Sequence, residues 1–245
     1  MKQILFFIPL LLFLNTKAQK TVTFPSKDGL TITADFYKTS DKKAPFIILF
    51  HQAGWSRGAY KEIAPKLNAL GFNCLAIDQR SGGEINGIIN QTHQQAKEKN
   101  LPVAYTDAMQ DMHAAVDYVK STFPMASKII IWGSSYSAAL VLKIAGERED
   151  IDAVLSFSPG EYFEKEGKPK DFITSSAKNI AIPVFITSAK NEKSYWWNIY
   201  EAIPAKRKQY FLPKNEGQHG SRALWEKFDE HEAYWNAVKS FLRSI

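Results

Sequence analysis

Five short stretches of the chain are apolar at almost every position, and a weaker sixth follows them. Runs of this kind are typical of strands that are buried on both faces, as in a parallel sheet. The six runs are "PFIILF" (45–50), "FNCLAID" (72–78), "KIIIWG" (128–133), "DAVLSF" (152–157), "PVFITS" (183–188) and "KQYFLP" (208–213). The pattern therefore predicts a mostly parallel central sheet.

The segment before these runs has a different pattern. "LTITADFY" (30–37) alternates apolar and polar residues, as a half-buried strand does. "KDG" (27–29) indicates a turn that joins this strand to "KTVTF" (20–24). We expect these two strands to form an antiparallel hairpin at the edge of the sheet.

Helical spacing of apolar residues separates the buried runs. The stripes are Tyr60, Ile63, Leu67 and Leu70, then Met109, Met112, Val116 and Val119, and finally residues spaced from Leu224 to Leu242. Alternation of strands and helices predicts an α/β fold with a doubly wound, mostly parallel sheet. Such sheets bind ligands at the carboxyl ends of their strands, so the residues after each run are the place to look for chemistry.

The first eighteen residues differ from the rest of the chain. A basic start at Lys2 precedes an apolar run (4–14), and small or polar residues follow at 16–18. This layout is typical of a secretory signal peptide, with cleavage expected after Ala18. An N-terminal membrane anchor is the alternative, although the run is short for a bilayer span. We expect residues 19–245 to form one domain of a secreted or periplasmic protein without stable membrane insertion.

Composition narrows the class of protein further. The chain has 245 residues, of which 45% are hydrophobic and 23% charged, which suits a soluble globular domain. Loss of Lys2 and Lys17 would leave 29 basic against 25 acidic residues, and would lower the net charge from +6 to +4. The basic run 205–210 is short, so no nucleic-acid partner is predicted. Five scattered histidines and one cysteine, Cys74, predict neither a metal site nor an internal disulfide.

Three strand ends carry a serine, an acid and a histidine in that order, which is the chain order that accompanies a nucleophile elbow. At such an elbow the residues two before and two after the nucleophile crowd each other. For Ser135 these are Gly133 and Ser137, which are small, whereas for Ser134 one would be Trp132. We therefore predict Ser135 as the nucleophile. The alternative is a group of serines that merely cap a helix.

His219 is the candidate base, because it lies in a loop between Gly217 and Gly220 just before the last predicted helix. His51 ends a strand and is expected to brace its own loop. His93 lies in a polar insert, and two others lie in helical patterns (His113 and His231). Acyl transfer also needs donors for a developing oxyanion. We expect these to be the backbone N–H groups of Tyr136 and Ala53.

These motifs resemble the α/β-hydrolase fold family, in its dienelactone hydrolase-like and small serine esterase branch. The resemblance rests on "LFHQAG", "DQRSGG", "GSSYS" and "GQHG" and extends from about Thr21 to the end of the chain. It implies hydrolysis of a carboxylic ester or lactone through an acyl-enzyme, with a catalytic triad and without a cofactor. Dienelactone hydrolases carry a cysteine nucleophile, so the serine here implies hydrolysis of a small-molecule ester.

The resemblance also implies that the acid follows the strand "PVFITS". Asn191 lies where the family most often has Asp, but an amide cannot supply the negative charge that a histidine base requires. Glu192 is the next residue and is predicted as the third member of the triad. Glu161, after the preceding strand, is the reserve candidate, and a triad without an acid is the remaining possibility.

Two parts of the chain allow more than one interpretation. The segment 84–105 is a possible lid over the pocket or a surface insert. Four aromatic residues could line an apolar pocket or could simply be packed: Trp55, Tyr136, Trp196 and Trp197.

Two further functions compete with the esterase. One is a peptidase of the prolyl oligopeptidase type, a family that normally carries a large propeller. The other is a catalytically dead α/β-hydrolase that acts as a binding protein.

Overall fold

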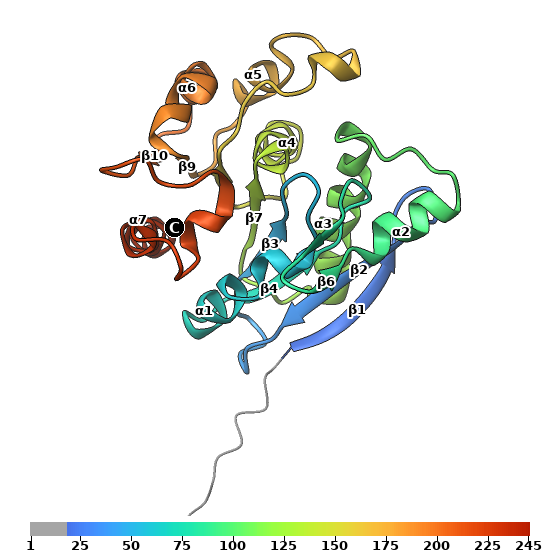
Figure 1. The fold of residues 1–245 in the computed structure, drawn as a ribbon. Coiled ribbons are helices and arrows are strands. Elements are labelled where there is room, and N and C mark those ends of the chain that lie inside the picture. The colour runs from blue at the N-terminus through green and yellow to red at the C-terminus, as the bar shows by residue number, and fades with distance from the viewer. Residues whose placement is uncertain (1–18) are drawn as a thin grey trace, which may run out of the picture.

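A computed structural model describes residues 19–245, so the predicted signal peptide lies outside the described residues (Figure 1). Eight strands form the main sheet in the order β1-β2-β4-β3-β7-β8-β9-β10. They are β1 (Gln19–Pro25), β2 (Thr31–Tyr37), β3 (Phe46–Phe50), β4 (Asn73–Ile77), β7 (Ile129–Ser134), β8 (Ala153–Phe157), β9 (Val184–Thr187) and β10 (Lys208–Phe211). Each of the six buried runs supplies one of the last six strands.

The sheet is parallel from β4 to β10, and β2 pairs antiparallel with both β1 and β4. The β1–β2 hairpin turns at Gly29, whose φ of 79° suits glycine. The edge hairpin and the mostly parallel sheet are confirmed. The antiparallel edge follows from the alternating pattern of β2, which differs from the continuous apolar pattern of the parallel strands.

Helices cover both faces of the sheet (Figure 1). Those on one face are α3 (Met109–Thr122), α4 (Tyr136–Ala145), α5 (Phe172–Ala177) and α6 (Lys193–Ala202), and those on the other are α1 (Ile63–Ala69) and α7 (His231–Arg243). Strand β3 shows why the runs are continuously apolar. Phe46, Ile48 and Phe50 enter one core, while Ile47 and Leu49 enter the other.

The last apolar stripe of the sequence is divided between two elements. Leu224 ends the 3-10 helix η5 (Gly220–Leu224), and α7 starts only at His231. Trp225 still packs in the same core as α7, and its indole donates to the carbonyl of Ala59 at 3.0 Å. The stripe therefore marks a common buried face rather than one continuous helix.

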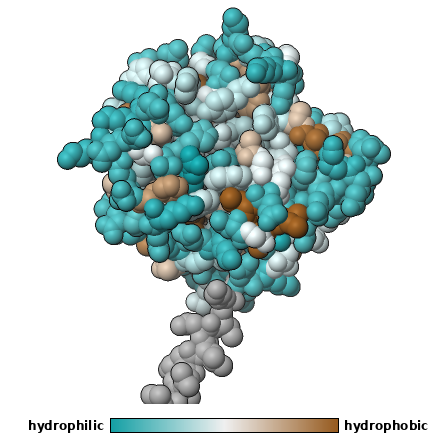
Figure 2. All heavy atoms as spheres, in the orientation of Figure 1, coloured by the Kyte–Doolittle hydropathy of each residue, from teal (hydrophilic) through white to brown (hydrophobic). Residues whose placement is uncertain are grey.

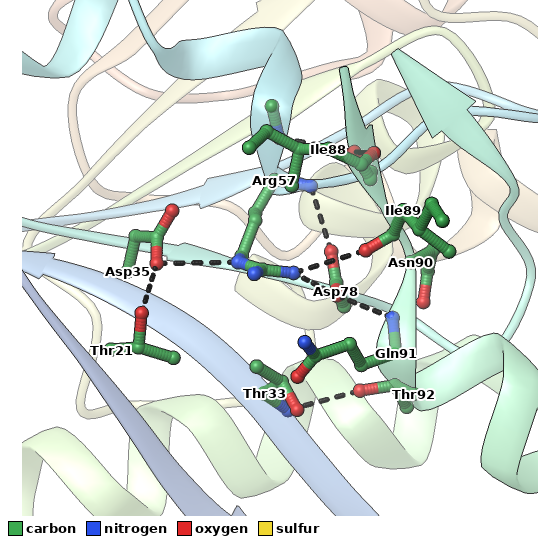
Figure 3. A network of polar contacts seen from close by, with 12 residues as sticks. Thr21, Thr33, Asp35, Arg57, Asp78, Ile88, Ile89, Asn90, Gln91 and Thr92 are labelled. Carbon is green, nitrogen blue, oxygen red and sulfur yellow. Dashed lines mark hydrogen bonds and ion pairs between the residues drawn. The ribbon is translucent and has the colours of Figure 1, made fainter. Parts of the chain in front are cut away.

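The segment 84–105 forms a small hairpin, β5 (Glu84–Ile85) with β6 (Ile88–Ile89), followed by α2 (Gln91–Glu98). A buried polar network fixes its first part (Figure 3). Asp78 accepts from Arg57 Nη1 at 2.6 Å and from the amide of Gln91 at 2.8 Å. Arg57, the first residue of the 3-10 helix η1 (Arg57–Tyr60), also forms an ion pair with Asp35 of β2 at 3.2 Å. Strand β2, η1 and the start of α2 are thereby joined at Asp78, the residue that follows β4.

The surface seen in Figure 2 is mainly hydrophilic, with apolar residues in separate small groups. Within residues 19–245, no helix is long and apolar enough to cross a bilayer. Cys74 is a free, fully buried thiol in β4, and burial raises its pKa. Such a thiol is a packing group rather than a nucleophile.

Candidate active site

The turn between β7 and α4 places Ser135 at a sharp corner. Ser135 has φ 59° and ψ −122°, a backbone conformation that is strained for any residue other than glycine. Two residues earlier, Gly133 has no room for a side chain, because a Cβ there would overlap the carbonyl of Ser137. The steric argument that selects Ser135 from the sequence thus describes the observed turn.

Ser137 stands where the elbow pattern usually has a second glycine, and the structure explains how it is tolerated. Its side chain is fully buried, donates to the carbonyl of His51 at 2.6 Å and accepts from Gln79 Nε2 at 2.7 Å. The hydroxyl therefore joins the start of α4 to the ends of β3 and β4 instead of crowding the elbow.

Ser134 and Ser135 are neighbours, but they face different surroundings. The Ser134 hydroxyl is buried and accepts from the amide of Ser221 at 2.9 Å. The Ser135 hydroxyl lies 2.8 Å from His219 Nε2. Only Ser135 has its oxygen directed at an imidazole.

His219 lies in the loop between β10 and η5, and it makes a second contact on its other nitrogen. Nδ1 lies 2.6 Å from Oε1 of Glu192, at the end of the 3-10 helix η4 (Lys190–Glu192). Gly217 and Gly220 flank this loop with φ values of 67° and 68°, which glycine adopts without strain. The three side chains predicted as a triad thus form one continuous chain of hydrogen bonds.

Glu192 has a second set of partners on Oε2. Ser158 Oγ donates to this oxygen at 2.6 Å, and the Ala189 amide donates at 3.2 Å. Burial by itself would raise the pKa of Glu192, but the hydrogen bonds from His219 and Ser158 hold it below its ordinary value. The carboxylate is therefore ionised at neutral pH and able to offset positive charge on the imidazole.

The two other acid-site candidates are not part of this chain. Glu161 accepts hydrogen bonds from the amides of Ile173 and Thr174 at 2.9 and 2.8 Å, and so caps the start of α5. Asn191 is exposed on η4. The structure thus brings Glu192, rather than either alternative, to His219.

His51 is fully buried and joins three segments. Its Nδ1 lies 2.8 Å from the carbonyl of Gln52, and its Nε2 accepts from the amide of Gln79 at 3.1 Å. Asn90 Nδ2 is 3.2 Å from the same Nε2. Burial lowers the pKa of His51 to about 4, because the charged imidazolium is disfavoured away from water and the hydrogen bond to the Gln52 carbonyl only partly offsets this. It is a neutral brace for the loop after β3.

The two amides expected to stabilise an oxyanion lie at the ends of adjacent strands. Ala53 is in the loop after β3 and Tyr136 begins α4 after β7, and β3 and β7 pair directly, with Phe50 opposite Gly133. Among the hydrogen bonds within residues 19–245, neither amide is used as a donor.

The four aromatic residues of uncertain role are mostly packed. Tyr136 stacks on Tyr105 with ring centroids 4.7 Å apart, and Trp55 stacks on Trp225 at 5.2 Å. Trp196 is fully buried and its indole donates to Ser188 Oγ. Trp197 belongs to an aromatic group with Tyr200 and Tyr210. Packing accounts for these rings.

Ser158 is a residue of the site that no sequence motif indicates. It directly follows β8 (Ala153–Phe157). Its position at the carboxyl end of a buried strand is the one feature of the sequence that could have pointed to it. A serine before Pro159 is ordinary in a turn, so its contact with Glu192 could be found only in three dimensions.

The chain is similar in sequence and in fold to several known proteins. The sequence model of the family described as serine aminopeptidase, S33, matches residues 41–171, which is more than half of the chain. The quorum-quenching protein AidA of Acinetobacter baumannii is 28% identical over 145 residues, covering 58% of this chain and 44% of its own length. The thiohydrolase apmlB of Arthrinium phaeospermum is 27% identical over 158 residues, covering 62% and 48%. The chain thus matches about half the length of these relatives.

Solved structures share the fold across nearly the whole described chain. The esterase Pf2001 of Pyrococcus furiosus superposes with a TM-score of 0.70 at 18% identity, covering 92% of each chain. A dienelactone hydrolase of Anabaena variabilis superposes with a TM-score of 0.69 at 14% identity, covering 92% of this chain and 97% of that one. Together with the match over residues 41–171, the sheet topology shows that this protein belongs to the α/β-hydrolase family, in the group described as serine aminopeptidase, S33.

Proposed function

We propose that this protein is a serine hydrolase that cleaves a small carboxylic ester through an acyl-enzyme intermediate. The observation that carries the proposal is the chain from Ser135 Oγ to His219 Nε2 at 2.8 Å and from His219 Nδ1 to Glu192 Oε1 at 2.6 Å. A nucleophile, a base and an acid within hydrogen-bond reach are the arrangement that activates a hydroxyl.

In the first half of the reaction, Ser135 Oγ attacks the ester carbonyl carbon and His219 Nε2 accepts its proton. The Nδ1–H group of His219 donates to Glu192, which fixes the tautomer and offsets the charge of the imidazolium. The amides of Ala53 and Tyr136 donate to the oxyanion. The C–O bond to the alcohol then breaks, the alcohol takes the proton from Nε2, and the acyl group stays on Ser135.

In the second half, a water molecule gives a proton to His219 Nε2 as its oxygen attacks the acyl carbon. The bond to Ser135 Oγ breaks, and Oγ recovers the proton from Nε2. The carboxylic acid leaves and the enzyme returns to its starting state. The positive φ of Ser135 supports this cycle, because it keeps the hydroxyl out at the corner of the elbow.

A peptidase is the competing activity, because the matching family is described as an aminopeptidase. An enzyme of that kind needs a free acid to bind the ammonium group of its substrate. Three acids of the loops after β8 and β9 already have partners: Glu161 caps α5, Glu166 accepts from the amides of Tyr105 and Thr106 at 2.9 Å each, and Glu192 binds His219. Glu164 of the same loop is exposed and its side chain makes no hydrogen bond or ion pair within residues 19–245, so the two activities are separated by the choice of substrates below.

We also propose that the segment 84–105 is a fixed wall rather than a lid. Asn90 is fully buried and donates to the carbonyl of Gln79 at 2.9 Å, while Thr92 Oγ1 accepts from the amide of Thr33 at 3.0 Å. Opening the segment would break these contacts and expose the Arg57–Asp78 pair.

A fluorophosphonate probe tests whether the serine is activated. We expect purified protein to be labelled at Ser135, and Ser135→Ala and heat-denatured protein to remain unlabelled. Absence of labelling in the folded wild type would instead support the catalytically dead binding protein. Mass spectrometry of the labelled peptide would identify the serine.

A substrate panel then separates the activities. p-Nitrophenyl esters of increasing acyl length, a matched thioester and aminoacyl p-nitroanilides would be compared by kcat/KM. We expect the esters to be the best substrates, with the thioester included because one relative is named a thiohydrolase. A preference for the anilides would replace the esterase proposal with the peptidase.

A further inference from the structure

Ser158 has a backbone conformation that needs an explanation. It directly follows β8 and precedes Pro159, is 1% exposed, and has φ 61°. A non-glycine residue in this region is uncommon and costs free energy, so it persists only where the surroundings enforce it. Its amide donates to Thr187 at 2.7 Å and its carbonyl accepts from Tyr162 Oη at 2.7 Å, so both of its backbone groups are held.

The hydroxyl of Ser158 joins two parts of the proposed triad. It donates to Glu192 Oε2 at 2.6 Å, and it accepts from the amide of Gly220 at 2.8 Å. Gly220 is the residue next to His219. One buried side chain thus contacts the acid itself and the loop that carries the base.

We propose that Ser158 is a positioning residue, which holds the Glu192 carboxylate and the His219 loop in the register that Ser135 requires. This proposal rests on the proposed hydrolase function of the same site. Oε1 and Oε2 of Glu192 then have separate tasks, since one binds His219 and the other is fixed by Ser158. Without the second contact, the carboxylate could rotate about its long side chain, and the imidazole would lose its orientation.

The choice of glutamate makes such a fixed point important. Glutamate has one more rotatable bond than aspartate, so its carboxylate is less well placed by the backbone alone. The Ala189 amide, at 3.2 Å, is the other donor to Oε2 and is the longer contact. Hydrogen bonds to a charged carboxylate also stabilise its ionised form, which agrees with the lowered pKa of Glu192.

Two substitutions separate the hydroxyl from the backbone. Ser158→Gly removes the hydroxyl and relaxes the positive φ, while Ser158→Ala removes the hydroxyl and keeps the strain. We expect both to lower kcat for p-nitrophenyl acetate about 10- to 100-fold, as expected for loss of one hydrogen bond to a charged group, with little change in KM. The acid limb of the pH–kcat profile should move to lower pH, because a carboxylate that no longer faces His219 stabilises the protonated imidazole less.

Ser156→Ala is the matched control. Ser156 is a buried serine two residues earlier, and its hydroxyl donates to the carbonyl of Ala138 at 2.9 Å. It should lose stability as Ser158→Ala does, with no shift of the pH profile. Thermal unfolding of each variant reports the structural cost separately.

A double-mutant cycle makes the test decisive. In a Glu192→Ala background, Ser158→Gly should lower kcat by a smaller factor than in the wild type, because the contact with the acid is already lost and only the contact with the Gly220 amide remains. Equal losses in both backgrounds, or full kcat in Ser158→Gly, would overturn the role of Ser158 while wild-type labelling by the fluorophosphonate still supported the hydrolase. Failure of the wild type to label would count against the hydrolase function itself.

Discussion

Two adjacent serines show how much a single backbone angle decides. Ser134 is the last residue of β7 and is buried against Ser221, whereas Ser135 lies outside the strand with a positive φ. The two hydroxyls are chemically identical, and only the turn gives one of them an imidazole partner. The proposed reactivity of Ser135 thus follows from its position rather than from its residue type.

Ser135→Ala should reduce turnover of an activated ester by roughly three to six orders of magnitude, since the nucleophile is lost while binding groups remain. Its melting temperature should stay close to that of the wild type. Ser134→Ala is the matched control and should keep most of the activity, because its hydroxyl serves the Ser221 amide. Rates from p-nitrophenyl acetate hydrolysis decide the matter, and the reverse ranking would move the nucleophile to Ser134.

Substitutions of Glu192 and Glu161 distinguish a role in catalysis from a role in helix capping. Glu192→Gln should lower kcat strongly, because the amide cannot offset the charge on His219. Glu161→Gln should leave kcat nearly unchanged and lower the melting temperature, since Glu161 caps α5. Steady-state kinetics and thermal unfolding of both variants measure the two effects. A strong loss of kcat in Glu161→Gln with unchanged stability would instead identify Glu161, in the loop after β8, as the acid.

At the scale of elements, one buried carboxylate lies where the hairpin β5–β6 joins the sheet. Asp78 accepts from the backbone amides of Arg57 and Gln91 as well as from the Arg57 guanidinium (Figure 3). The ends of β4, η1 and the segment 84–92 meet at this group, which is fully buried. A loop that would be mobile by length alone is thereby attached to the sheet.

Asp78→Ala should lower the free energy of unfolding by about 3 to 5 kcal/mol, because it leaves Arg57 buried beside one remaining acid. Amide hydrogen exchange in residues 84–92 should accelerate more than exchange in β7. Glu226→Ala, which breaks the exposed pair with Lys66, is the control and should change stability little. Unchanged exchange in the hairpin of Asp78→Ala would show that other contacts hold it.

At the scale of the whole molecule, one neutral histidine makes global stability depend on pH. His51 has an ordinary pKa of 6.5 when unfolded and about 4 in the fold. Between these values the unfolded chain binds a proton that the folded protein does not, so stability falls as the pH decreases from 6.5 to 4. The full effect is about 3 kcal/mol.

His51→Gln removes this contribution, so its unfolding free energy should depend less on pH over that range than that of the wild type. Urea unfolding at pH 7, 5.5 and 4.5 would measure the difference. The variant will be less stable at pH 7, because the brace between the Gln52 and Gln79 segments is altered. Parallel pH curves for the two proteins would exclude His51 as the source.

The proposed exported form is also a prediction about the whole chain. Cleavage after Ala18 would start the protein at Gln19, which is the first residue of β1, so the sheet would be kept intact. N-terminal sequencing and intact mass of protein recovered from the secreted or periplasmic fraction would check this. Protein that retains Met1 in that fraction would contradict the predicted cleavage.

Much of the fold can be read locally, because apolar runs and helical stripes are properties of neighbouring residues. Continuous runs such as 128–133 identify buried parallel strands, and the alternation at 30–37 identifies the edge. The stripe that ends at Leu242 predicts the buried face correctly but not the helix boundaries, because η5 and α7 share that face and are separated by residues 225–230. The family resemblance follows from motifs of the same local kind.

The sequence by itself determined which strand ends carry polar side chains, and sterics around Gly133 singled out Ser135 as the expected nucleophile. Only the tertiary structure decided between Glu192 and Glu161, because both follow strands and only one points at His219. It alone revealed Ser158, which meets Gly220 from 62 positions away. Contacts between distant segments depend on sheet order and side-chain direction, and no local pattern encodes either.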